Sequence, residues 1–237
     1  MKRMLFPLLN KFPNEAIWLI FAVVNFFGIS AFYKLFGKTG LFVWIGFGTV
    51  VANIQVLKII DFFGFTATLG NITYGTIFLA TDALNEKYGK KLANQAVWLG
   101  FMTLLSLVII MQITLRFHPH TIDNAHPHLE YLFNLVPRIA LASLTAYLIS
   151  QFFDVYFFNK IKKRFDSDKM LWLRNNGSTI VSQLLDTLIF VTIAFWGVVS
   201  YSDWLNIMLT TYFIKVIVAL LDTPFMYWIK KITPLND

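Results

Sequence analysis

The chain has 237 residues, of which 57% are hydrophobic and only 14% are charged. Soluble domains contain about 25% charged residues, so this composition excludes an ordinary soluble protein and indicates an integral membrane protein. The net charge of +7 comes from basic residues that gather in short loops. Such residues set membrane orientation, so no nucleic acid partner is expected. The chain has no cysteine, which excludes disulfides and thiolate chemistry.

Long apolar stretches fill most of the chain. A helix needs about 20 mostly apolar residues to cross the hydrocarbon core of a bilayer. The composition therefore predicts an all-α, polytopic bundle in which residues 1–237 form a single transmembrane domain. The first two stretches are separated only by GKTG, so six and seven spans both stay open. The seven predicted spans are residues 16–36, 41–60, 66–85, 93–115, 134–158, 177–199 and 204–229.

The loop charges predict the orientation. On the seven-span reading, one side carries only Lys2, Arg3, Lys11, Lys58 and Arg116. The positive-inside rule puts the other, more basic side in the cytoplasm. The C-terminus is then cytoplasmic and the N-terminus extracytoplasmic. The thirteen basic residues of the cytoplasmic side are Lys34, Lys38, Lys87, Lys90, Lys91, Lys160, Lys162, Lys163, Arg164, Lys169, Arg174, Lys230 and Lys231.

Polar residues recur inside several spans at helical spacing. A charge in hydrocarbon costs at least about 2.5–3.5 kcal/mol, so these side chains are expected to face a polar interior. The sequence therefore predicts a cavity, shared by several helices and large enough for a nucleobase. The stripes are Asn71, Gly75, Phe78, Asp82 and Glu86; Ser143, Tyr147, Ser150, Gln151 and Asp154; Thr179, Ser182, Gln183 and Asp186; and Thr211, Lys215 and Asp222.

Asp186 and Lys215 lie deepest. They are about 14 Å and about 16 Å along their helices, near the middle of a core about 30 Å thick. Their spans form an antiparallel hairpin, so the two side chains are predicted to pair. A structural ion pair and a site that binds a polar solute both stay open.

The remaining intramembrane ionisable residues are candidates for a proton relay or for gating. Most lie nearer the cytoplasmic end of their spans, where solvation is easier. Arg138 begins its span on the opposite side, where its side chain can also snorkel to lipid headgroups. These candidates are Asp82, Glu86, Asp154, Arg138 and Asp222.

Motifs for catalysis or cofactor binding are not found. There is no dinucleotide-binding, phosphate-binding or nucleophile motif, so neither an enzyme nor a cofactor is expected. The segment HPHTIDNAHPH offers imidazoles that zinc could use, but structural zinc sites usually have four ligands and cysteine gives no help here. The weak metal candidates are His118, His120, His126 and His128.

Four blocks resemble the queuosine precursor transporter family, also described as vitamin-uptake membrane proteins. In chain order they are LGNITYGTIFLATDALNEKYGKKLANQAVWLGF (69–101), RIALASLTAYLISQFFDVYFFNKIKK (138–163), LWLRNNGSTIVSQLLDTLIFVTIAFWG (171–197) and TTYFIKVIVALLDTP (210–224). The resemblance implies uptake, through the bacterial inner membrane, of deazaguanine precursors, chiefly 7-cyano-7-deazaguanine and also 7-aminomethyl-7-deazaguanine, for tRNA queuosine. It also implies a six-helix core plus an extra N-terminal helix. The family-pattern positions are Asp82, Arg138, Gln151, Asp154, Asn175, Asn176, Gln183, Asp186 and Lys215.

A deazaguanine ring offers N–H donors that a carboxylate accepts and a carbonyl that an amine or amide satisfies. We expect Asp186 at the donor edge, Lys215 or Gln183 near the carbonyl, and aromatic rings against the plane. Uptake of another planar heterocycle or vitamin, or a membrane scaffold, stay as alternatives, and a homo-oligomer or a shared energising module stays open. The predicted substrate-binding residues are Asp186, Lys215, Gln183, Asn71, Tyr74, Phe78, Gln151 and Asn176.

Overall fold

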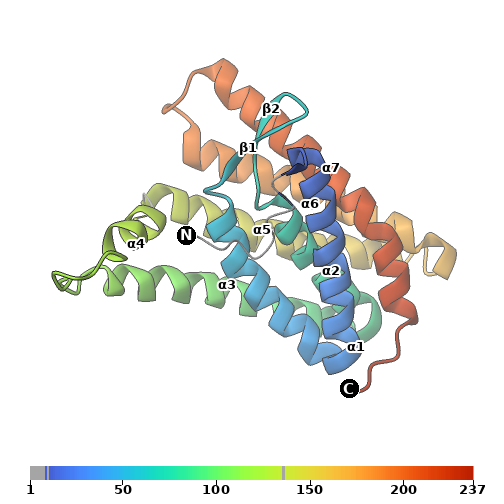
Figure 1. The fold of residues 1–237 in the computed structure, drawn as a ribbon. Helices are drawn as coiled ribbons and strands as arrows, with labels where there is room; N and C mark the ends of the chain where they lie inside the picture. Colours follow the sequence, from blue (N-terminus) through green and yellow to red (C-terminus); the bar gives the residue numbers. More distant parts are fainter. Residues whose placement is uncertain (1–8, 10, 135–136, 237) are drawn as a thin grey trace.

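The computed structural model describes residues 9, 11–134 and 137–236 and is almost entirely helical outside one short hairpin, which confirms the all-α prediction (Figure 1). Lys2 and Arg3 of the orientation argument and residues 135–136 of a predicted span lie outside the described residues. The elements are α1 (Asn14–Gln55), β1 (Ile59–Phe62), β2 (Phe65–Thr68), α2 (Asn71–Tyr88), α3 (Lys90–Thr114), α4 (His126–Phe133), α5 (Pro137–Lys162), η2 (Asp168–Met170), α6 (Leu171–Phe195) and α7 (Tyr201–Lys231).

Helix α1 is two helical arms joined at a sharp bend. Gly37 has φ 58° and ψ −142°, a conformation that residues with a side chain avoid. The second arm folds back on the first, and its Trp44 ring packs against Gly28. A Cβ at Gly28 would lie only 2.6 Å from this ring, so the close contact requires glycine. The same ring contacts Phe32 edge-to-face, with 5.4 Å between the ring centroids. The arms correspond to the predicted spans 16–36 and 41–60 and meet next to the C-terminus (Figure 1).

The segment after α1 is a β-hairpin, which the sequence reading missed. Strands β1 and β2 pair antiparallel, with Phe62 opposite Phe65. Phe63 and Gly64 form the turn with φ of 49° and 79°, as two-residue hairpin turns require. The second predicted span therefore ends at Gln55 rather than at residue 60, and the third helix begins at Asn71 rather than at 66. The run IIDFFGFTAT is rich in β-branched and aromatic residues, which explains the strands.

Five helices of the described chain are long and apolar enough to cross a membrane. They are Asn14–Gln55, Lys90–Thr114, Arg138–Lys162, Asp168–Phe195 and Tyr201–Lys231. This supports a multi-pass membrane protein; the count of seven spans stays a prediction. Large apolar side chains such as Val24 and Phe213 are more than 60% exposed, as expected for a surface that faces lipid.

Helix α2 lies at the centre. It contacts α1, α3, α5, α6 and α7, and all its residues from Asn71 to Asn85 except Tyr74 are buried. Helices α5 and α6 form one packed pair, and α6 and α7 form another. Because α2 carries Thr, Asn, Asp and Glu residues, its central position brings polar side chains into the middle of the bundle.

Candidate substrate site

The deepest polar contact is an ion pair between Asp186 of α6 and Lys215 of α7. Lys215 Nζ donates to Asp186 Oδ2, so the predicted pairing is present. Asp186 Oδ1 accepts hydrogen bonds from Tyr74 Oη at 2.7 Å and from Ser150 Oγ at 3.0 Å. Asp186 and Lys215 are only 4% and 7% exposed. A buried carboxylate stays charged only where it is paired and hydrogen-bonded, and this one has both kinds of partner.

Aromatic rings line one side of the ion pair. Lys215 Nζ lies 5.0 Å from the centroid of the Tyr74 ring. The Tyr74 ring meets Phe78 at 5.5 Å and Tyr147 at 6.4 Å between centroids, both edge-to-face. The structure thus brings together Tyr74, Phe78, Asp186 and Lys215 from the predicted substrate-binding set.

The amides of the predicted set are buried and only partly bonded. Gln151 is fully buried, and neither Nε2 nor Oε1 has a hydrogen-bond partner. Gln183 Oε1 and Asn176 Oδ1 are also unpartnered, although Asn176 Nδ2 donates to Trp172 O and to Thr223 Oγ1. Asn71 is buried at the first residue of α2. A buried polar group without a partner costs about 1–3 kcal/mol, so Gln151, Gln183 and Asn176 are suited to bind a polar solute that enters the interior.

Three buried carboxyl groups, Asp82, Asp154 and Asp222, form a second cluster, the acid cluster. Asp82 and Asp222 each interact electrostatically with Asp154. Each accepts a hydrogen bond from α6: Asp82 from Thr179 at 3.2 Å, Asp154 from Ser182 at 2.7 Å and Asp222 from Asn175 at 2.8 Å. None has an ion-pair partner among the described residues.

Glu86, at the end of α2 just beyond the predicted span, binds three cations. Its carboxylate lies 2.9 Å from Lys162 Nζ, 2.7 Å from Arg174 Nη2 and 2.6 Å from Lys230 Nζ. We call this group the Glu86 clamp. It ties α2 to α5, α6 and α7 at one end of the bundle.

The charge state of Glu86 follows from its partners. Burial by itself raises the pKa of this carboxyl, but hydrogen bonds from the three cations outweigh it and lower the pKa to about 2. The carboxylate therefore keeps its charge at all physiological pH values. This favours gating over proton relay among the predicted roles of Glu86.

Arg138 and the histidines do not join the interior. Arg138 is exposed, and its guanidinium donates to the carbonyls of Ile193 and Trp196, where α6 ends. A cation at that position satisfies the free carbonyls of the last helical turn. Within the described chain, no group of three or more His, Asp or Glu side chains could hold a metal ion. His118, His120, His126 and His128 lie in the loop before α4 and in its first turn.

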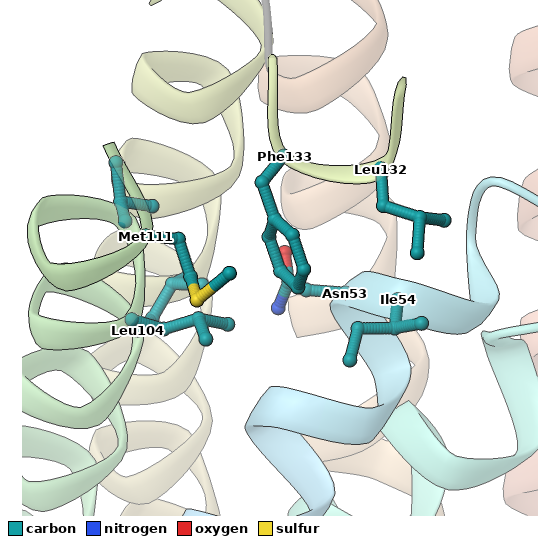
Figure 2. Close-up of a pocket in the computed structure, with 8 residues that line it drawn as sticks. Asn53, Ile54, Leu104, Met111, Leu132 and Phe133 are labelled. Carbon is teal, nitrogen blue, oxygen red and sulfur yellow. The ribbon is translucent and has the colours of Figure 1, made fainter. Parts of the chain in front are cut away.

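The cavities lie elsewhere. Figure 2 shows Asn53 and Phe133 at a cavity of about 10 Å³, which has room for about one water molecule. An open groove of about 680 Å³ runs between α1 and α3 past Val50 and Trp98. Neither is lined by the buried carboxylates, and the expected cavity for a nucleobase among them stays a prediction.

Sequence reasoning undervalued two groups of residues. From the sequence, Ser150, Thr179 and Ser182 were interpreted only as members of polar helix faces. In the structure each donates a hydrogen bond to a buried carboxylate. Lys162 and Lys230 were counted as orientation charges but bind Glu86. No local signal reveals these partners, because the residues are 76 and 144 positions away from Glu86 in sequence.

A multi-pass helical protein whose interior holds an ion pair, an acid cluster and unpartnered amides has the construction of a membrane transporter for a polar solute. A family model described as "Putative vitamin uptake transporter" matches residues 68–229, and the chain belongs to this family.

Similar proteins carry consistent names. The "Probable queuosine precursor transporter" of Bacillus subtilis (strain 168) is 53% identical over 94% of this chain and 97% of its own length. The "Queuosine precursor transporter" of Escherichia coli (strain K12) is 30% identical over 71% of this chain and 75% of its own. A "Probable queuosine precursor transporter" of Haemophilus influenzae is 27% identical over 70% of this chain and 68% of its own length. No solved structure matches this chain significantly. The predicted family membership is therefore confirmed.

Proposed function

We propose that this protein imports a queuosine precursor, 7-cyano-7-deazaguanine or its 7-aminomethyl counterpart, across the bacterial inner membrane for tRNA modification. The relative that is 53% identical over 94% of the chain and carries the queuosine precursor name supports the substrate class. The proposed topology has seven spans: the two arms of α1 and helices α2, α3, α5, α6 and α7. The C-terminus is cytoplasmic and the N-terminus extracytoplasmic, as the loop charges favour.

The observation that carries a purine-like ligand is the Gln151 carboxamide, which is fully buried with both its nitrogen and its oxygen unpartnered. A guanine-type ring has a carbonyl acceptor beside a ring N–H donor, and a carboxamide presents the complementary donor and acceptor. The Asp186 carboxylate can accept from the exocyclic amine, and the Tyr74 and Phe78 rings can hold the plane.

The transport step requires the packed interior to open. In this structure the Glu86 clamp ties α2, α5, α6 and α7 together at one end. A carrier that opens alternately to each side of the membrane has to break such contacts and form others. We therefore assign the clamp a gating role, with the substrate bound between the clamp and the opposite end.

A bacterial strain that cannot make the precursor tests the proposal. When 7-cyano-7-deazaguanine is supplied, the wild-type gene is expected to restore queuosine in tRNA. Gln151→Leu removes both hydrogen-bonding atoms and is expected to lower uptake at least about tenfold, since two lost hydrogen bonds of about 1 kcal/mol or more each exceed 1.4 kcal/mol. Gln95→Leu, on the exposed face of α3, is the matched control and should transport normally.

The outcomes separate the candidates. Normal membrane abundance with lost uptake in Gln151→Leu supports the site, and lost abundance indicates a structural glutamine. No restoration by the wild-type gene rejects the queuosine substrate. Uptake of another planar heterocycle or vitamin is the second candidate, because the family description refers to vitamin uptake. Competition of labelled precursor uptake by an excess of unlabelled vitamins distinguishes these two functions.

A further inference from the structure

The acid cluster has no counter-charge. Asp82 and Asp154 are completely buried and Asp222 is 1% exposed. The two buried cations of the described chain are already engaged, since Lys215 pairs with Asp186 and Arg174 with Glu86. Three ionised carboxylates side by side in a membrane interior would repel one another and lack solvation. Something with positive charge therefore has to reside there.

The hydrogen-bonding pattern of the cluster points the same way. Asp82 Oδ1 and Asp154 Oδ2 accept from no other donor among the described residues, and these two carboxyls lie close enough to share a hydrogen bond, which requires a proton on one of them. Asn175 gives an independent sign: it is fully buried, its Nδ2 donates to Asp222, and its own Oδ1 has no partner. All three unpartnered atoms are acceptors, so the cluster is short of donors rather than of acceptors. A proton on a carboxyl oxygen supplies both the missing charge and a donor.

Among the described residues, the main groups that interact with the three carboxyls are one another and neutral side chains. Helix α2 contributes Asp82, α5 contributes Asp154 and α7 contributes Asp222. Helix α6 contributes only neutral side chains to these carboxyls, namely Asn175, Ser178, Thr179 and Ser182. No group of three or more His, Asp or Glu residues in the described ranges has the geometry for a metal ion.

The acid cluster and the Asp186 site are built on adjacent turns of the same helices. Asp154 lies one turn beyond Ser150 on α5, and Ser182 lies one turn before Asp186 on α6. Ser150 donates to Asp186, and Ser182 donates to Asp154. Each carboxylate is therefore hydrogen-bonded by a serine that lies one helical turn from the other carboxylate. A change in protonation at Asp154 therefore acts on the same two helices that position Asp186.

We propose that Asp82 and Asp154, with Asp222 beside them, form a proton-binding site that couples substrate uptake to inward movement of a proton. The inference rests on the proposed transport function. A proton from the outer aqueous phase forms an O–H bond on one carboxyl oxygen of Asp82 or Asp154, which removes one negative charge and lets these two carboxyls share a hydrogen bond in the packed arrangement seen here. On the cytoplasmic side that O–H bond breaks, the proton leaves to water, and the carboxylate regains its charge.

Proteoliposomes containing the full-length protein test the coupling with labelled 7-cyano-7-deazaguanine. With one proton per substrate, an inward gradient of one pH unit is expected to drive accumulation up to about tenfold. Asp82→Asn and Asp154→Asn are each expected to lose this accumulation, while exchange of labelled for unlabelled substrate persists. Asp166→Asn, in the exposed loop before α6, is the matched control and should behave like the wild type.

A second measurement needs no substrate. In wild-type protein, infrared spectroscopy is expected to show the carbonyl stretch of a protonated carboxylic acid, which disappears as the pH is raised. The signal should weaken in Asp82→Asn and Asp154→Asn and persist in Asp166→Asn. Carbodiimide labelling of the unmodified wild type, mapped by mass spectrometry, is expected at Asp82 or Asp154 and does not depend on any variant folding.

The outcomes distinguish this inference from the transport function. Exchange without any effect of the pH gradient would overturn the coupling and leave transport intact. Accumulation driven by a sodium gradient instead would also overturn it. If the wild type exchanges no 7-cyano-7-deazaguanine, the proposed substrate is rejected. The infrared and labelling measurements, which need no substrate, then test the proton site by themselves. Absence of both a pH-dependent acid signal and labelling at these residues would reject the proton site.

Discussion

The Asp186–Lys215 pair offers a direct way to separate a structural ion pair from a substrate site. Lys215→Met leaves the Asp186 carboxylate buried with only the Tyr74 and Ser150 hydroxyl donors. Breaking a buried pair by removing one partner costs about 3–5 kcal/mol, because the other charge is left uncompensated. For a chain of this length, each 1 kcal/mol shifts the melting temperature by about 2–4 °C. The expected loss is therefore on the order of 10 °C for Lys215→Met and similar for Asp186→Asn.

The double variant Asp186→Asn/Lys215→Met carries no charge at this position. Replacement of a whole buried pair by neutral groups is often close to neutral in stability, so most of the lost melting temperature should return. Thermal unfolding of the detergent-solubilised protein measures this effect, and precursor uptake is measured on the same variants. If Asp186 binds substrate, uptake stays lost in the double variant even though stability recovers. Recovery of uptake together with stability would refute the substrate role and leave a purely structural pair.

Two further predictions concern the Glu86 clamp and the bend of α1. The lowered pKa of Glu86 means that its contribution is fully present above the ordinary glutamate pKa of about 4.5 and is lost as the pH falls toward 2, an effect of up to about 3 kcal/mol. The free energy of unfolding, measured from pH 6 to pH 3, should fall in the wild type and in the control Glu130→Gln, which changes an exposed residue. The fall should be smaller in Glu86→Gln; the same pH dependence as in the wild type would contradict the prediction. Gly37→Ala should destabilise the protein by about 1–3 kcal/mol, because alanine avoids the positive φ of this residue, whereas Gly46→Ala on the same arm meets only ordinary contacts. Equal melting temperatures for these two glycine variants would show that the bend tolerates a side chain.

The two buried carboxylate sites have different partners and, on the proposals above, different tasks. Asp186 has a cation and two hydroxyl donors as partners. The acid cluster has hydroxyl and amide donors but no cation, so its charge can change. In a carrier that uses the proton gradient to accumulate a neutral heterocycle, a group whose charge can change connects uptake to the movement of the proton.

The amino-acid sequence by itself determined the membrane class, the helical fold and the polar faces of the spans. Helical periodicity is a local property, so the spacing of polar residues revealed which side chains point inward. The pairing of Asp186 with Lys215 was also accessible, because both residues lie on one hairpin of consecutive helices with a short turn.

Contacts between distant helices were decided only by the tertiary structure. The three cations on Glu86, the capping of α6 by Arg138 and the adjacency of Asp82 to Asp154 depend on how α2, α5, α6 and α7 pack. The hairpin after α1 was likewise beyond sequence reasoning. Periodicity shows which face of a helix is polar, but only packing decides which faces meet and how much space remains between them.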